Sequence, residues 1–184
     1  MTALQSYLSS RVEVSVGDIT QEAVDAIVNA ANGSLMGGGG VDGAIHRACG
    51  PAVKAACGEI RRAQYPQGLP TGEAVITTAG NLPAKHVIHT VGPVYGSGGA
   101  DKADLLAACY FNSMSLAVRH KLKSIAFPAI STGIYGYPMD KAAAVSSRTI
   151  EQFLSVDQSI TVVKLVFFAA GDAEGFLKHQ KFTG

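Results

Sequence analysis

Short apolar runs alternate with amphipathic segments along this chain, and that alternation restricts its fold more than any other feature. Six runs have the length and composition of strands: Val12 to Val16, Asp25 to Asn29, Glu73 to Thr78, His86 to Val91, Ser124 to Ile130 and Val162 to Ala169. The last run is nearly continuous apolar, which is typical of the most central or best covered strand of a sheet.

The intervening segments are predicted as helices: Asp42 to Cys49, Ala52 to Gln64, Asp101 to His120, Pro138 to about Leu154, and Asp172 to Lys181. Strands that alternate with helices favour a sheet covered on both faces. We therefore predict an α/β fold, a three-layer α/β/α sandwich around a mixed central sheet. A length of 184 residues suits one domain spanning residues 1–184.

The composition indicates a folded protein without a strongly charged partner. Hydrophobic residues make up 47% of the chain, charged residues 16%, and the net charge is +1, so neither disorder nor nucleic-acid binding is indicated. Residues 1–10 lack the basic start and apolar core of a signal peptide, and no apolar run approaches the ~20 residues of a membrane span. We expect a cytoplasmic monomer with no membrane partner.

The cysteines and histidines do not form a metal-binding pattern. Cys49, Cys57 and Cys109 are odd in number and lack metal-type spacing, so we expect three small buried side chains. His86 and His89 fall on opposite faces of one predicted strand, with His89 buried. We therefore expect no catalytic metal and no cofactor.

Four consecutive glycines, Gly37, Gly38, Gly39 and Gly40, precede Val41, Asp42 and Gly43 at a predicted helix start. Glycine costs backbone entropy on folding, and it permits backbone N–H groups to approach a ligand closely. The N-terminus of a helix has unpaired N–H groups and a partial positive charge. The sequence therefore predicts a phosphate-binding loop here.

Two other phosphate-binding motifs fit this loop poorly. A Walker-type loop requires Gly-Lys-Ser/Thr, where this chain has Gly40-Val41-Asp42. Gly38, Gly40 and Gly43 match the dinucleotide pattern G-x-G-x-x-G. However, Asn29 to Met36 separates them from the preceding strand, and no acidic residue ends the next strand near Thr78-Ala79.

A second loop joins the strand Ser124 to Ile130 to the helix that follows it. It contains Ser131, Thr132, Gly133, Ile134 and Tyr135, and it lies where α/β sheets bind ligands, at a strand's carboxyl end. Two such loops can hold a diphosphate from both sides. The alternative is a structural helix start at Pro138 with locally packed tyrosines.

Five segments together resemble the macrodomain family, specifically its MacroD-type branch, which includes bacterial O-acetyl-ADP-ribose deacetylases. They are Gly17 to Thr20, Ile27 to Asn32, Gly37 to His46, His89 to Pro93 and Phe127 to Pro138. The resemblance covers nearly the whole chain. It implies a three-layer α/β/α fold that binds ADP-ribose across the carboxyl edge of its sheet.

The resemblance also implies roles for individual residues. Asp18 and the Ile19 backbone are expected at the adenine, and both loops at the diphosphate. Asn32, Asp42 and Tyr135 are expected around the distal ribose. Phe168 is expected to stack on the base, although the small residues after it, Ala169-Ala170-Gly171, depart from the family pattern.

The implied reaction is hydrolysis at the anomeric carbon C1″ of the distal ribose, or of an ester on that ribose, with a protein Asp or Glu carboxylate or acetate as the leaving group. Asn32 can fix the sugar, although an Asx-type turn is its structural alternative. Asp42 can orient water, although helix capping is its structural alternative. A helix N-terminus stabilises the charged carboxylate, which makes it a weak general base. His46 lies one turn later, within reach of Asp42, and we interpret His46 and Asn29 as structural.

Three functions remain open at this point. The first is a hydrolase acting on O-acetyl-ADP-ribose and on mono-ADP-ribosylated Asp or Glu of proteins. The second is a module that reads ADP-ribose without turnover, and the third a regulatory protein acting through partner or RNA contacts. The presence of both Asn32 and Asp42 favours the hydrolase, because a reader needs no water-orienting carboxylate.

Overall fold

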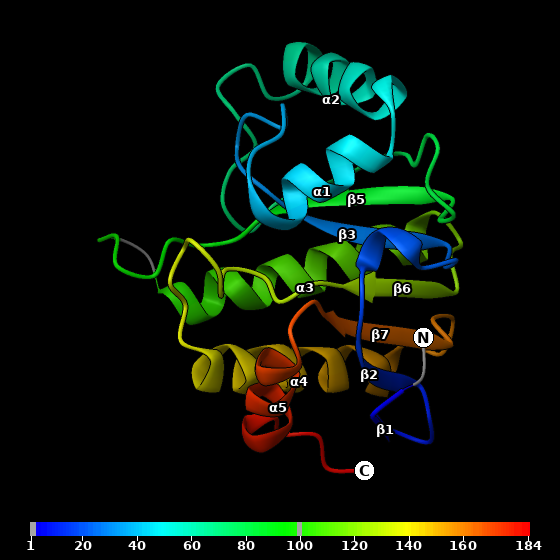
Figure 1. Ribbon diagram of the computed structural model, residues 1–184, viewed down its shortest axis with the longest axis vertical. Coiled ribbons are helices and arrows are strands. Elements are labelled where there is room, and N and C mark those ends of the chain that lie inside the picture. Colours follow the sequence, from blue (N-terminus) through cyan, green and yellow to red (C-terminus); the bar gives the residue numbers. More distant parts are fainter. Residues whose placement is uncertain (1–2, 99–100) are drawn as a thin grey trace.

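The computed structural model describes residues 3–98 and 101–184, and its central feature is a seven-stranded mixed sheet (Figure 1). The strand order is β1-β2-β7-β6-β3-β5-β4. Strands β1 and β4 run antiparallel to their neighbours, and the five between them are parallel. The bounds are β1 Gln5–Tyr7, β2 Val12–Val16, β3 Ala26–Ala31, β4 Ala74–Thr78, β5 His86–Val91, β6 Ser124–Phe127 and β7 Val162–Phe167.

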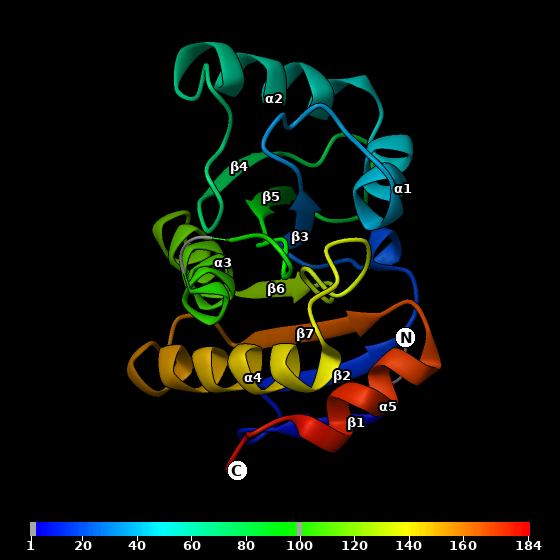
Figure 2. The same ribbon diagram turned by 90° about the vertical axis from the view of Figure 1, so that its left-hand side faces the viewer.

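Helices cover both faces of this sheet and complete the predicted three layers. Helix α1 (Gly40–Ala48) and helix α3 (Lys102–Arg119) lie on opposite sides of the strands in Figure 2. The other helices are α2 Pro51–Ala63, α4 Met139–Val156 and α5 Ala170–His179, with a short 3-10 helix η1 at Ile19–Gln21. None of the helices in the described residues is long and apolar enough to cross a membrane.

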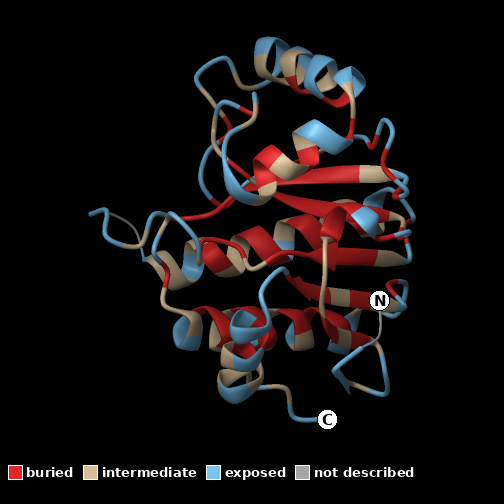
Figure 3. Ribbon diagram, in the orientation of Figure 1, coloured by how far each residue is buried: buried red, intermediate tan, exposed pale blue. Residues whose placement is uncertain are grey.

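Alternate residues of each inner strand enter two separate hydrophobic cores. Ile27 of β3 and Val87 of β5 pack under α1 and α2, whereas Val28 and Ile88 pack under α3, α4 and α5. This period of two places apolar side chains on both faces of a sheet that is buried on both sides. The inner strands are accordingly buried over most of their length (Figure 3).

The predicted elements differ from the observed ones mainly at their ends. Strand β1 was not predicted, because three residues without an apolar pattern give no periodic signal. The predicted strand Ser124 to Ile130 already ends at Phe127, before Pro128, and the predicted strand Val162 to Ala169 ends at Phe167. The latter, β7, is well covered, but β6 occupies the middle of the sheet.

Asp25 joins the starts of three neighbouring strands at the amino edge of the sheet. Its carboxylate accepts hydrogen bonds from the backbone N–H groups of Lys123 and Ser124, at 2.8 and 3.1 Å, where β6 begins. The Lys85 ammonium before β5 lies 2.7 Å from its other oxygen. Lys85 and these N–H groups lower the pKa of Asp25 from 3.8 to about 2.

Asp25→Asn is expected to destabilise the fold by about 1–2 kcal/mol at pH 7, because the charged form of Asp25 is favoured in the native state. The stabilisation is complete above the ordinary pKa of 3.8 and is lost as the pH falls through about 2. Urea unfolding of both proteins between pH 7 and pH 2 measures this difference. A difference that stays constant down to pH 2 would show that the charge of Asp25 is not its cause.

Candidate functional site

The predicted site residues follow the carboxyl ends of four parallel strands. Asp18 follows β2, Phe168 follows β7, the loop from Ser131 follows β6, and Asn32 follows β3. Because parallel strands end at the same edge of a sheet, the topology brings these separate segments to one edge. This edge is the usual ligand site of open α/β sheets.

The glycine loop runs directly into α1, which begins at Gly40, two residues earlier than predicted. Gly40 has a φ of +56°, a conformation that favours glycine. A Cβ atom at Gly38 would lie 3.0 Å from Asp42 Oδ2 and 3.2 Å from Asn32 Nδ2, so a side chain there would crowd both. Gly39 and Gly40 face open space, which leaves the first turn of α1 accessible to an anion.

Asp42 is buried in the first turn of α1, with 5% of its surface exposed. It does not cap the helix, because the N-cap is Gly39 and no side chain caps this end. Its Oδ1 instead accepts a hydrogen bond of 2.8 Å from Asn29 Nδ2 and lies 3.3 Å from His46 Nε2. The predicted contact with His46 is thus present, and the capping alternative is wrong.

A chain of buried polar groups continues from Asp42 into the sheet. Asn29 Nδ2 also lies 3.1 Å from Nδ1 of His89, whose Nε2 lies 3.0 Å from Thr77 Oγ1. An amide nitrogen only donates, so we assign Nδ1 of His89 as acceptor and place its proton on Nε2, facing Thr77. Burial, reinforced by the nearby His46, lowers the pKa of His89 to about 3 and keeps it neutral.

Asn29 is the residue that the sequence reasoning undervalued. It was interpreted as structural, yet it is fully buried and holds the Asp42 carboxylate. An asparagine inside an otherwise apolar strand was the available signal, because a buried amide requires partners. The three cysteines are buried and free as predicted, and Cys57 Sγ lies 3.6 Å from His89 Nε2.

Asn32 is half-buried and forms the Asx-type turn that was its structural alternative. Its Oδ1 accepts hydrogen bonds from the backbone N–H and the hydroxyl of Ser34, and its Nδ2 donates to the Gly37 carbonyl at 3.1 Å. Through these bonds Asn32 fixes the start of the glycine loop. Its side chain also lies beside Asp42, as the Gly38 contacts show.

The second loop is held by hydrogen bonds within itself and by one from the backbone N–H of Tyr95 to the Tyr135 carbonyl. Ser131 is buried with a φ of +66°, its carbonyl accepts from the N–H of Tyr137, and Thr132 Oγ1 donates to the Ala129 carbonyl. Tyr137 packs against Tyr95 of the segment after β5, with ring centroids 4.9 Å apart, so this contact joins two segments rather than staying within the loop. Gly133 and Ile134 are exposed, and Tyr135 is half-buried.

The residues expected at the adenine follow the carboxyl ends of two neighbouring strands, β2 and β7. Asp18 is the N-cap of η1, and its Oδ1 accepts hydrogen bonds from the backbone N–H and the hydroxyl of Thr20. Ile19 is buried. Phe168 is 86% exposed directly after β7, so its ring is accessible to a ligand at this edge of the sheet. Among the described residues there is no cluster of three or more His, Cys, Asp or Glu side chains arranged to hold a metal.

His89→Gln is expected to flatten the pH dependence of stability between pH 6.5 and about pH 4. In the wild type, the unfolded chain binds a proton near pH 6.5 that folded His89, with a pKa of about 3, does not bind. Stability therefore falls as the pH falls, by up to about 1.4 kcal/mol per pH unit from this group. Urea unfolding at several pH values measures how the free energy of unfolding changes with pH in the wild type and in the variant. The same change in both proteins would mean that folded His89 does not have a lowered pKa.

Comparison with known proteins identifies the family. The model of the Macro domain family matches residues 28–146. An O-acetyl-ADP-ribose deacetylase from Escherichia fergusonii is 58% identical over 148 residues, 80% of this chain and 82% of that protein. The Oceanobacillus iheyensis macrodomain with ADP has a TM-score of 0.88 at 48% identity, over 91% of this chain and 88% of that one. The Trypanosoma brucei macrodomain in complex with ADP-ribose has a TM-score of 0.83 at 36% identity, over 92% and 68%. The chain therefore belongs to the macrodomain family.

Proposed function

We propose that this protein binds ADP-ribose at the carboxyl edge of its sheet and hydrolyses ADP-ribosyl esters. Its substrates are O-acetyl-ADP-ribose and proteins that bear mono-ADP-ribose on Asp or Glu. The observation that supports this most is the Asp42 carboxylate, which is buried beside the glycine loop and does not cap helix α1. The deacetylase relative and the macrodomains solved with ADP and ADP-ribose agree with it.

In this proposal the two loops hold the diphosphate of the substrate. The first turn of α1 offers backbone N–H groups and the positive end of the helix dipole. The loop from Ser131 to Tyr135 approaches from the opposite side, and Tyr135 covers the distal ribose. Asp18 accepts from the adenine amino group through Oδ2, since its Oδ1 is engaged by Thr20, while Phe168 stacks on the base.

Asp42 acts by orienting a water molecule rather than by strong base catalysis. On a modified Asp or Glu, the water attacks C1″ of the distal ribose, a new C1″–O bond forms, and the bond from C1″ to the carboxylate breaks. On O-acetyl-ADP-ribose, the water attacks the acetyl carbonyl carbon, the bond from that carbon to the ribose oxygen breaks, acetate is released, and the ribose oxygen takes up a proton. A phosphate oxygen of the substrate takes up the proton of the water. Asn29 donates a hydrogen bond to Asp42, and His46 lies beside it. Asn32 keeps the distal ribose in place, so positioning provides most of the rate enhancement. The mechanism requires no metal or cofactor.

Asp42→Ala is expected to abolish most hydrolysis, by about a hundredfold or more in kcat, because the water loses its orienting group. ADP-ribose affinity should stay within about tenfold of the wild type, about 1.4 kcal/mol. The kcat is measured from ADP-ribose release with O-acetyl-ADP-ribose and with glutamate-linked substrate. The ADP-ribose affinity is measured by calorimetry.

The matched control is Asp140→Ala, which removes an exposed carboxylate from the first turn of α4. It should leave both quantities unchanged. Joint loss of turnover and affinity in Asp42→Ala would mean that Asp42 is needed for the fold of the loop. Tight ADP-ribose binding without turnover in the wild type would make the protein a reader and reject the hydrolase.

Asn29→Ala is expected to lower kcat by about tenfold or more with little change in KM, because one hydrogen bond to a charged group is worth about 1.5–3 kcal/mol. Asn112→Ala is the control, since it removes a similar amide, which donates to the Gly72 carbonyl at 2.8 Å. Steady-state kinetics and unfolding should be measured on both variants. Equal losses of kcat at equal stability would show that Asn29 acts only through the fold.

A further inference from the structure

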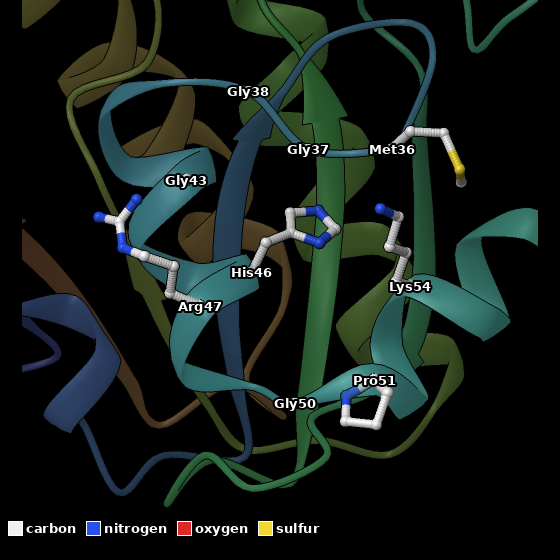
Figure 4. Close-up of a pocket in the computed structure, with 9 residues that line it drawn as sticks. All are labelled: Met36, Gly37, Gly38, Gly43, His46, Arg47, Gly50, Pro51 and Lys54. Atoms are coloured by element: carbon white, nitrogen blue, oxygen red, sulfur yellow. The ribbon is translucent and has the colours of Figure 1, made fainter.

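A cavity of about 390 Å³ lies between α1, the start of α2 and the Met36–Gly38 segment (Figure 4). This volume is within the range of small-ligand sites. The cavity shares Gly37, Gly38 and Gly43 with the glycine loop and its helix, but none of the residues expected at the adenine or in the second loop line it. It therefore shares the glycine loop with the diphosphate cradle but extends away from the adenine side and from the second loop.

The lining of this cavity is basic. His46, Arg47 and Lys54 contribute to it, and none of its lining residues in the described part of the chain is acidic. Arg47 and Lys54 are exposed, and neither is in an ion pair with another described residue. In Figure 4 the Lys54 side chain extends toward the segment of Met36 and Gly37, and Arg47 extends toward Gly43.

His46 connects the cavity with Asp42. Its ring lies between α1 and α2 in Figure 4, 3.5 Å from where a Cβ atom on Gly37 would be, and its Nε2 lies 3.3 Å from Asp42 Oδ1. On the next residue, a Cβ atom of Gly38 would meet the other Asp42 oxygen at 3.0 Å. Gly38 and His46 thus both line the basic cavity and lie next to the carboxylate of the proposed reaction.

We propose that this cavity binds the polypeptide that carries the ADP-ribosyl ester, through acidic residues beside the modified Asp or Glu. The inference rests on the proposed function and specifies its substrate. The substrate polypeptide regains a free carboxylate on hydrolysis, and acidic residues beside the modified position add further negative charge. A basic cavity next to the reaction centre is complementary to such a polypeptide. An acetyl group is too small to extend across it. A nucleic acid is held through a row of phosphate contacts, whereas this cavity offers only His46, Arg47 and Lys54.

The test compares three substrates: O-acetyl-ADP-ribose, a glutamate-linked mono-ADP-ribosylated peptide with flanking Asp and Glu residues, and the same peptide with flanking Ser and Gln. The variant is Arg47→Gln with Lys54→Gln, which keeps side-chain length and removes two charges. Lys123→Gln with Lys178→Gln is the control, because it removes two exposed charges that do not line the cavity.

We expect the wild type to prefer the acidic peptide over the neutral one through KM, by about fivefold to tenfold for two exposed charge contacts. The Arg47/Lys54 variant should lose this preference, and the control should keep it. Both variants should turn over O-acetyl-ADP-ribose within about twofold of the wild-type rate. Raising the salt concentration should weaken the preference for the acidic peptide in the wild type and in the control, because salt screens exposed charges.

Equal turnover of acidic and neutral peptides by the wild type would overturn the proposal, as would an equal loss on all three substrates in the variant. An ADP-ribosylated oligonucleotide serves as a fourth substrate, and a loss of turnover in the Arg47/Lys54 variant that is confined to it would overturn the proposal and assign the cavity to nucleic acid. Binding of the unmodified acidic peptide is followed by NMR, from the chemical shifts of the Gly37 and Lys54 backbone amides. This measurement tests the cavity without requiring any hydrolysis. If the peptide shifts these amides but no substrate is hydrolysed, the proposed function fails and the cavity assignment stands.

Discussion

The hydrogen bond from Asn29 to Asp42 is the interaction on which the proposed site depends. It joins the buried strand β3 to the first turn of α1, and the same amide contacts His89 of β5, which in turn contacts Thr77 of β4. The carboxylate is therefore fixed relative to three strands, whereas a loop alone would leave it mobile. A water-orienting group needs this support, because a displacement of about 1 Å can cost a hundredfold in rate.

Most polar groups of this buried chain pair with one another, and only Oδ1 of Asn29 is left without a hydrogen-bond partner among the described residues of the chain. Unpaired polar groups in a protein interior are costly, and here a neutral histidine, an amide and a hydroxyl supply donors and acceptors in the required order. The low pKa of His89, about 3, follows from the same burial. The glycines have a related function, since the Gly38 carbonyl lies 2.6 Å from where a Cβ atom of Gly43 would be. Only a glycine allows the loop to lie this close to α1.

The sequence predicted the loops of the candidate site better than the buried residues that hold Asp42 in position. The glycine run and the Ser131–Tyr135 segment are local patterns with local physical meaning, and both lie at the predicted edge. Asn29 was undervalued because its partners are 13 and 60 residues away in the chain. The basic cavity was not predicted, because Lys54 and the glycine loop come together only through the packing of α2.

The sequence by itself determined the alternation of strands and helices, the burial of both sheet faces and the position of the glycine loop, because side-chain period and glycine content act locally. Tertiary structure decided the strand order and the register that sets Asn29 directly beside His89. It also decided that Asp42 turns to Asn29 rather than capping its helix. These outcomes depend on contacts between distant segments, which no local pattern of residues specifies.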